Sequence, residues 1–315
     1  MEIGLTYLCQ ECLLQYLDAN RRIQLSARCP SVRKLDELVP LRIETLTIRE
    51  KEITLNRIKY KVDDSFLEMK NQLALKEFSI HITKTLPFNE IMNKLMGFFF
   101  NGRKEIKVHR FKAKCALESV VPQGLKFMTP NLIVDQNSIT TAEQFIHEDS
   151  LPIQHLVLGN WPSTVDRFPF DVDIVRNAKF LEIIAAFQSE EDGWFQIVSQ
   201  LSNRQVSLAG FSIAYQAVAL LITSWKEQLK DVGYKIIVDY GHGNLERLKD
   251  ELNSLLSIGE VAEDFGRERV YTAKHISIPL THTSNILINF LETTGRPRIE
   301  ILTVRHIPEI IQNQE

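Results

Sequence analysis

The sequence predicts an α/β protein in which three short helices precede a solenoid of strand–helix repeats with a parallel, curved sheet. Three observations lead to this fold class. Residues 5–40 carry apolar residues at helical spacing, interrupted twice. Pairs of apolar residues then recur through the middle of the chain at a nearly constant interval, and helix signals lie between these pairs.

The first predicted element, residues 1–40, is a unit of three short helices. Apolar residues from Leu5 to Leu17 follow a spacing of three and four residues. The stretch Asp18-Ala19-Asn20 interrupts this run and can cap a second helix, and Pro30 fits the first turn of a third. Because a domain below about 40 residues seldom builds an independent core, we expect this unit to pack on the solenoid, on a partner or on both.

The solenoid needs a cap at each end, since terminal repeats would otherwise expose apolar surface. Residues 41–70 are expected to supply the first cap, because "LRIETLTIREKEITLNRIKYKV" reads as two strands around a charged turn at residues 49–52. Residues 261–315 are expected to form a β-rich second cap, with strands in "RVYTAKHISIPL" and "RPRIEILTVRHI".

Residues 71–260 are predicted to form the solenoid itself. Seven pairs of apolar residues separated by one residue recur at steps of 24 to 30 residues. A strand and a helix in about 25 residues is typical of leucine-rich repeats, in which stacked units bury a core that one unit lacks. The pairs are Ile80/Ile82, Ile106/Val108, Leu132/Val134, Leu156/Leu158, Leu181/Ile183, Val206/Leu208 and Ile236/Val238.

Helices are expected between these pairs. Pro87 can begin one and Asn101-Gly102 can end it. The other expected helices lie in "TAEQFIHE", "DVDIVRNAK", "WFQIVSQL", "AYQAVALLITSWKEQLKDVG" and "NLERLKDELNSLL".

The second and fourth positions of each expected strand face outward, away from the helices. Several are aliphatic, which fits either a face partly covered by loops or a protein-binding surface with an apolar centre. Tryptophans after two strands are candidate anchors. The candidate substrate-binding residues are Lys107, His109, Ile133, Asp135, Val157, Trp161, Glu182, Ile184, Trp194, Ser207 and Asp239.

The first 35 residues resemble an F-box. The matching positions in "LTYLCQECLLQYLDANRRIQLSARCPSVRKL" are Leu5, Leu8, Leu13, Leu17, Ile23, Leu25, Ser26, Cys29 and Val32, although Thr6 stands where the family commonly has Pro and the third-helix Trp is absent. "CPSVRKLDELVPLRIETL" is similar to F-box-like proteins that are greatly expanded in nematodes.

The resemblance implies a substrate receptor of a Skp–cullin–F-box ubiquitin ligase, without catalysis of its own. The helices would bind a Skp-type adaptor and the repeats would hold the target for proteasomal degradation, in some nematode systems a toxin. The implied adaptor-binding residues are Leu5, Leu8, Leu13, Leu17, Ile23, Leu25 and Pro30. The alternative is a repeat scaffold or inhibitor whose N-terminal helices only cap the array.

Other classes of function have little support in the sequence. A net charge of −3 gives no basic excess for nucleic acid, and no window reads as a membrane span or secretory signal. Cys9 and Cys12 lack a second ligand pair for zinc and are expected to be buried thiols. His109 with Asp135 is the best acid–base pair, and a surface contact explains it equally well. We expect no cofactor or metal, and a cytoplasmic or nuclear protein with reduced thiols.

Overall fold

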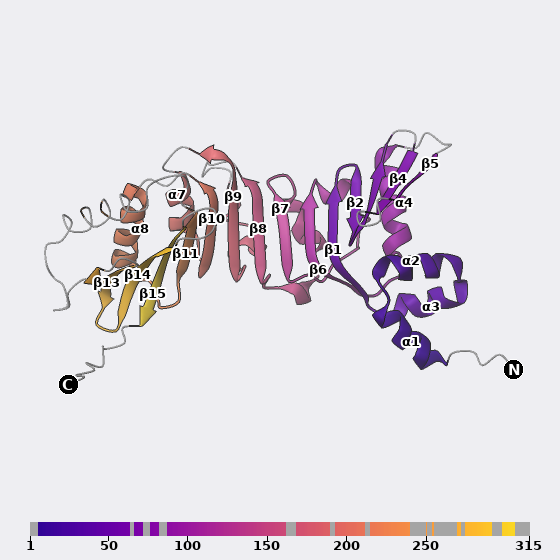
Figure 1. The fold of residues 1–315 in the computed structure, drawn as a ribbon, viewed down its shortest axis with the longest axis horizontal. Coiled ribbons are helices and arrows are strands. Elements are labelled where there is room, and N and C mark those ends of the chain that lie inside the picture. The colour runs from indigo at the N-terminus through magenta and orange to yellow at the C-terminus, as the bar shows by residue number, and fades with distance from the viewer. Residues whose placement is uncertain are drawn as a thin grey trace. The chain divides into compact units, whose positions relative to one another are not determined.

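The computed structural model describes residues 6–63, 66–71, 76–81, 87–161, 168–189, 193–211, 215–239, 250, 254, 270–271, 275–291 and 298–305. The chain divides into two compact units, Met1–Val157 and Leu158–Glu315. Both units combine helices with a sheet, so the α/β class is confirmed (Figure 1).

Three helices open the first unit: α1 (Tyr7–Tyr16), α2 (Ala19–Arg28) and α3 (Pro30–Leu38). The breaks between them have the expected local causes. The Asp18 carboxylate accepts a hydrogen bond from the Asn20 backbone N–H at 2.9 Å and caps α2. Pro30 occupies the first turn of α3, where its missing N–H has no intrahelical partner to lose. The three predicted helices are confirmed.

The sheet of the first unit has the strand order β7-β6-β1-β2-β3-β4-β5. Strands β1 to β5 form an antiparallel meander, whereas β1, β6 and β7 run parallel. The two patterns therefore meet at β1. The strands are β1 (Leu41–Arg49), β2 (Glu52–Leu55), β3 (Ile58–Val62), β4 (Phe66–Asn71), β5 (Lys76–His81), β6 (Ile106–Lys114) and β7 (Asn131–Asp135).

The sheet of the second unit has the order β12-β13-β14-β15-β11-β10-β9. Strands β9, β10 and β11 run parallel to one another. In the rest of the order, from β11 through β15, β14 and β13 to β12, each strand pairs antiparallel with the next. β8 (His155–Trp161) spans the boundary between the units. The strands are β9 (Phe180–Ser189), β10 (Gln205–Phe211), β11 (Lys235–Asp239), β12 (Val270–Tyr271), β13 (His275–Thr281), β14 (Ser284–Leu291) and β15 (Arg298–Arg305).

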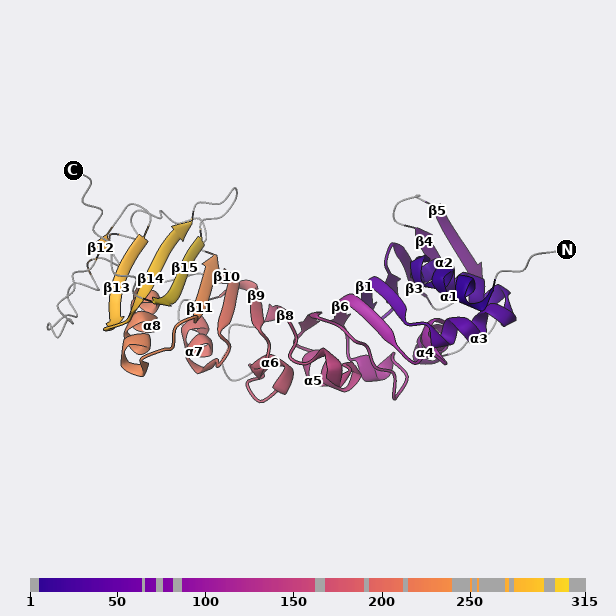
Figure 2. The ribbon, with the colours of Figure 1, turned by 90° about the horizontal axis from the view of Figure 1, so that it is seen from below.

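Within each unit the helices between strands lie on one side of the sheet (Figure 2). In the first unit, aromatic rings pack in this layer. The ring centroid of Phe99 in α4 lies 4.8 Å from that of Tyr60, and the ring centroid of Phe100 lies 5.6 Å from that of Phe127. The helices are α4 (Phe88–Phe100), α5 (Ile139–Ala142), α6 (Asp173–Arg176), α7 (Gly193–Gln200) and α8 (Tyr215–Gln228), with short 3-10 turns at Leu117–Ser119, Glu143–Phe145 and Glu148–Ser150.

The predicted apolar pairs from Ile106/Val108 to Ile236/Val238 form the buried side of the sheet. Each of these twelve side chains is between 0 and 4% exposed, so the period-2 alternation that predicted the repeats is confirmed for six of the seven pairs. The five expected helices that begin between residues 87 and 215 are present. Of the helix expected at residues 244–256, the structure describes only residues 250 and 254, both helical.

The prediction of a parallel sheet is confirmed only in part, because both ends of the strand order are antiparallel. Ile80, the first expected repeat position, lies in β5, which pairs antiparallel with β4. The strand parallel to β6 is instead β1. The first of the parallel strands is therefore β1, which lies in the segment expected to form the N-terminal cap. The meander from β1 to β5 places β5 at the edge of the sheet, away from β6. Ile82 lies outside the described residues.

Candidate functional site

Helix α1 is apolar on two sides, and the described residues cover one of them. Leu14 is 1% exposed and packs with Leu35 and Val39. On the other side Leu8 is 73% exposed and Tyr16 is 86% exposed. Their spacing, with Cys12 between them, places them on one face of the helix. An open apolar helix face of this kind is typical of a protein-interaction site.

A buried ion pair joins the second and third helices. The side chains of Arg22 in α2 and Asp36 in α3 are each 1% exposed, and their nearest nitrogen and oxygen lie 2.6 Å apart. The other Arg22 N–H groups donate to the backbone carbonyls of Pro40 at 2.8 Å and Val39 at 2.9 Å. The guanidinium therefore also ties α2 to the chain entering β1.

The Asp36 carboxylate accepts two further hydrogen bonds, from Ser26 at 2.5 Å and from Arg103, which follows α4, at 2.5 Å. Burial by itself raises the pKa of Asp36, but the hydrogen bonds from Arg103 and Ser26 and the charge of Arg22 outweigh it and hold the pKa below its usual value. Burial also lowers the pKa of Arg22, against the attraction of Asp36. The network links three helices, and each of its three charged groups has a partner of opposite charge.

Polar contacts also fix the start of α2 to the turn between β2 and β3. The Asn20 side-chain amide donates to the Leu55 carbonyl at 3.0 Å, and its oxygen accepts from the Tyr60 hydroxyl at 3.4 Å. Asn56, with a positive φ of 53°, donates to the Asp18 carboxylate at 2.9 Å. Helix α2 is thus held to the sheet by hydrogen bonds to backbone and side chains.

Six of the seven residues implied by the F-box resemblance are described, and they have three different environments. Leu8, Leu13 and Pro30 are exposed, Leu17 and Leu25 are half-buried against the Leu14 cluster, and Ile23 is 4% exposed. Leu5 lies outside the described residues. The expectation that Ile23 belongs to an open contact surface is therefore corrected, because α2 turns it toward the interior. The sequence reasoning missed three exposed apolar side chains: Tyr7, Tyr16 and Leu38.

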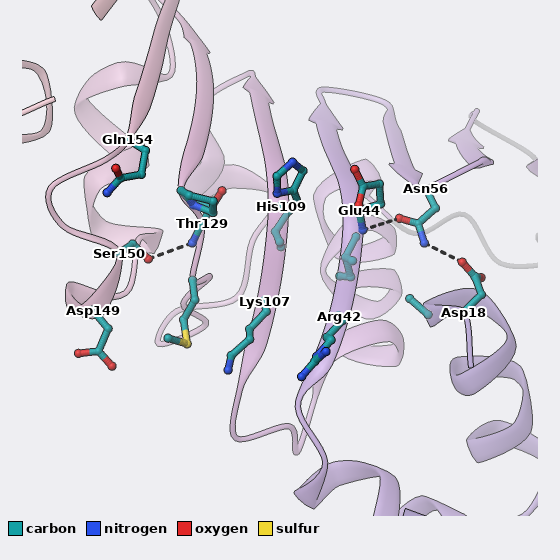
Figure 3. A pocket seen from close by; sticks show the side chains of 15 residues that line it. Asp18, Arg42, Glu44, Asn56, Lys107, His109, Thr129, Asp149, Ser150 and Gln154 are labelled. Carbon is teal, nitrogen blue, oxygen red and sulfur yellow. Dashed lines mark hydrogen bonds between the residues drawn. The ribbon is translucent and has the colours of Figure 1, made fainter. Parts of the chain in front are cut away.

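A cavity of about 640 Å³ opens on the outward side of the first unit's sheet (Figure 3). Arg42 and Glu44 come from the start of β1, and Lys107 and His109 come from the start of β6. Apolar parts of the lining include Met128 and Pro130 of the segment before β7. The rest of the wall comes from Asp18, Ala19, Ile43, Asn56, Val108, Thr129, Asp149, Ser150 and Gln154.

Four predicted substrate-binding residues lie in β6 and β7. Lys107 and His109 line the cavity, and Ile133 and Asp135 are half-buried on β7. His109 and Asp135 do not form an acid–base pair. Asn131 donates to the His109 carbonyl, whereas Asp135 lies four residues further along β7 and accepts from Ser138 at 2.7 Å.

The remaining predicted residues lie in β8 and the second unit. Val157 is 7% exposed, which removes it from an open surface. Glu182 and Ile184 of β9 and Ser207 of β10 are half-buried. Trp161 is the last residue of β8 and Trp194 is the second residue of α7, whereas both were expected in loops after strands. Asp239 is the last residue of β11. The structure describes the backbone at these last three positions, and their side chains lie outside the described part.

Cys9 and Cys12 are exposed on α1, so the expectation that they are buried thiols is wrong. Cys115 is half-buried, and burial, together with Asp135 and Glu50, raises its pKa to about 12. In the described residues, no group of three or more His, Cys, Asp or Glu side chains is placed to hold a metal ion. None of the helices in the described part of the chain has the length and apolar character needed to cross a membrane.

Residues 87–242, just under half of the chain, match the model of a family described as a domain of unknown function, DUF3557. The match begins at the residue before α4 and ends just after β11, so it covers α4 to α8 and β6 to β11, but neither α1 to α3 nor β1, the strand parallel to β6. No F-box family model matches. No curated protein and no solved structure matches the chain.

Proposed function

We propose that this protein is a substrate receptor of a Skp–cullin–F-box ubiquitin ligase. Helix α1 binds a Skp-type adaptor, and the sheet holds the protein to be ubiquitinated. The observation that carries this proposal is the open apolar face of α1, on which Leu8 and Tyr16 are 73% and 86% exposed. This face lies in the segment that resembles an F-box.

The contact has the chemistry of a helix bound in an apolar groove. Leu8, Leu13 and Tyr16 recur at three- and five-residue intervals along α1, and Leu38 adds an exposed apolar side chain at the end of α3. The Arg22–Asp36 network fixes α2 and α3 before any partner arrives. A preorganised surface of this kind loses less conformational entropy on binding.

The receptor itself makes no covalent bond. Its role is to raise the effective concentration of substrate lysines beside the ubiquitin-loaded enzyme, which converts an encounter between two proteins into a reaction within one complex. The protein is therefore a non-catalytic subunit, and its substrate is a protein.

A second candidate function also has an observation in its favour. Ile23, Arg22 and Asp36 are buried within the chain, and Asn20 bonds to the Leu55 carbonyl. These contacts suit three helices that cap a repeat scaffold or inhibitor without recruiting a ligase. The open face of α1 remains unexplained by this alternative, because a cap covers apolar surface rather than exposing it.

Adaptor capture by purified protein separates the two candidates. We expect wild-type protein to retain a Skp-type adaptor on an affinity resin, and Leu8→Asp/Leu13→Asp to lose it, because two charges then enter an apolar contact. Both leucines are exposed, so the urea midpoint should stay unchanged. Leu220→Asp is the matched control, since Leu220 is a 55% exposed leucine on α8.

Two results would count against the ligase assignment. One is wild-type protein that is folded but captures no adaptor, which favours the scaffold. The other is equal capture by the double variant and the wild type, which removes α1 from the contact.

A further inference from the structure

The outward side of β1 and β6 in the first unit carries six positively charged side chains. Along β6, buried residues alternate with exposed or half-buried ones, and His109 and Arg110 are consecutive residues outside the core. Two consecutive residues outside the core interrupt the alternation on β1 as well, at Glu44 and Thr45, so the alternation shifts by one residue at the same place in both strands. Phe111 contacts Phe127, which contacts Phe100 of α4, so the neighbouring Arg110 and Lys112 face away from α4, as Lys107 and His109 do in the cavity wall. The outward cations are Arg42 and Arg49 on β1, and Lys107, Arg110, Lys112 and Lys114 on β6.

Like charges are direct neighbours across these two strands. Arg42 is the register partner of Lys107, and Arg49 is the register partner of Lys114. Side chains at paired positions lie close enough to interact, and like charges placed opposite each other destabilise a sheet. Burial lowers the pKa of Lys112, and the charges of Arg110, Lys114 and Arg49 lower it further. The positive groups therefore act on one another.

Among the described residues, carboxylates pair with cations at the two ends of this surface. Glu105 lies 2.9 Å from the Lys107 ammonium, and Glu52 lies 3.9 Å from Arg49. Within the described residues, no carboxylate lies within 4.0 Å of the side-chain nitrogens of four cations: Arg42, Arg110, Lys112 and Lys114.

Other described acidic groups near this region are Glu44, Asp18, Asp149 and Asp135. Glu44 is the one carboxylate among the outward positions of β1 and β6. Asp18 and Asp149 line the cavity, but Asp18 is bonded to Asn56 and Asp149 lies 3.5 Å from His147. Asp135 on β7 is bonded to Ser138. A ligand with negative charge would relieve the repulsion that remains.

From this arrangement we infer that the outward face of β1 and β6 binds an acidic segment of the substrate in an extended conformation. The inference rests on the proposed function, because it names the chemistry of the protein that this receptor holds. Lys112 and Lys114 stand two residues apart on β6, at about 6.6 Å, which is also the spacing of alternate side chains in an extended peptide. Arginine and lysine bind carboxylates through charge-assisted hydrogen bonds.

The neighbouring cavity adds a site for an apolar side chain. Its volume of about 640 Å³ has room for an aliphatic or aromatic residue together with its neighbours in the same segment, and Met128 and Pro130 supply apolar contacts. Arg42 and Lys107 lie in the cavity wall (Figure 3) and also belong to the charged surface, so the two features share these residues.

Single-stranded nucleic acid is the less suitable polyanion. Sheet surfaces that bind it stack bases on aromatic side chains. No Phe, Tyr or Trp occupies an outward position of β1 or β6, where Phe111 points into the core.

The test uses the full chain and a fluorescent peptide in which Glu alternates with Ser around one central Leu. We expect saturable binding that weakens as salt is raised. In Arg110→Glu/Lys112→Glu the dissociation constant should rise at least about tenfold, since each charge-assisted hydrogen bond contributes about 1.5–3 kcal/mol and 1.4 kcal/mol is a factor of ten. The neutral variant Lys112→Gln should show a smaller rise in the same direction.

The matched control is Lys34→Glu/Lys94→Glu, which makes the same change of charge on α3 and α4. It should bind the peptide like the wild type. Equal binding by all variants, or no binding of the peptide by wild-type protein, would overturn the inference. Tighter binding of single-stranded RNA or of phosphatidylserine vesicles at the same salt concentration would overturn the choice of a peptide.

The failure of this inference is distinguishable from failure of the proposed function. Adaptor capture is scored on the same proteins, and Arg110→Glu/Lys112→Glu should retain the adaptor while it loses the peptide. Leu8→Asp/Leu13→Asp should show the reverse.

Discussion

Helices α1 and α2 are neighbours of equal length, yet their burial is the opposite of what their composition suggests. Helix α1, "YLCQECLLQY", is largely apolar and has one buried residue, Leu14. Helix α2, "ANRRIQLSAR", is strongly polar and has five buried residues, Asn20 and Arg22 among them. The difference is one of partners. The polar groups of α2 have partners within this chain, whereas much of the apolar surface of α1 has none in the described residues.

This contrast separates two ways in which a short helix is held in place. Helix α2 is attached by directional bonds, which fix its position but give little surface for a second protein. Helix α1 is attached along one apolar stripe, and the described residues leave another apolar stripe exposed. A buried polar network suits the anchoring role, because each group that loses its partner leaves a neighbour unsatisfied.

Asp36→Asn should give the largest effect on this arrangement. The variant removes the negative charge that Arg22 and Arg103 share, and leaves both guanidinium groups in a buried site without compensation. Breaking a buried ion pair in this way costs about 3–5 kcal/mol of the free energy of unfolding. Urea unfolding should show a lower midpoint, and hydrogen exchange should speed up first in residues 19–38. Asp149→Asn, at an exposed position, is the control.

The pH dependence of the same variant provides a second check. Because the pKa of Asp36 is lowered in the folded protein, its carboxylate stabilises the fold fully above the unfolded pKa of about 3.9. That stabilisation is lost as the pH falls through the lower, folded pKa. The stability difference between wild type and Asp36→Asn should therefore be constant above about pH 5 and shrink below about pH 4. A difference that grows on acidification would contradict the assignment.

Asn20→Ala should have a smaller effect. The change leaves the Leu55 carbonyl without its donor and the Tyr60 hydroxyl without its acceptor, both in buried surroundings. We expect a loss of about 1–3 kcal/mol in the free energy of unfolding. Gln24→Ala, at an exposed position on the same helix, serves as the comparison. Equal stability of the two variants would show that the Asn20 hydrogen bonds do not contribute to the attachment of α2 to the sheet.

The sequence predicted the features that depend on local periodicity. The alternation of Ile106 with Val108 and of its later equivalents marks one buried side of a strand wherever that strand pairs. The same alternation does not show which strands pair with each other. Nothing in residues 76–81 indicates that β5 joins a meander, because the hairpins that place it depend on contacts with β4 and β3.

The candidate sites divide in the same way. Lys107 and His109 were predicted as outward residues and do line the cavity. Ile23 was misplaced, because helical spacing shows that a residue belongs to an apolar stripe but not what covers the stripe. Arg22 and Asp36 were missed, since a buried ion pair between residues 14 apart leaves no pattern in the sequence. The basic surface was missed because the shift at Glu44 and His109 breaks the period-2 pattern.

Alkylation of the cysteines should have the smallest effect on stability and gives a direct measure of whether α1 is open. Cys9 and Cys12 are exposed on the same helix as Leu8, whereas burial keeps Cys115 protonated at pH 8 because its pKa is about 12. With iodoacetamide at that pH, mass spectrometry should show Cys9 and Cys12 modified well before Cys115. The free energy of unfolding should change by no more than about 0.5 kcal/mol, as at other exposed positions.

A Skp-type adaptor should protect both α1 thiols and leave the rate of modification of Cys115 unchanged. Slow modification of Cys9 and Cys12 in the isolated protein would mean that this face of α1 is already covered, and a rate that rises on dilution would identify a second copy of the chain as the cover.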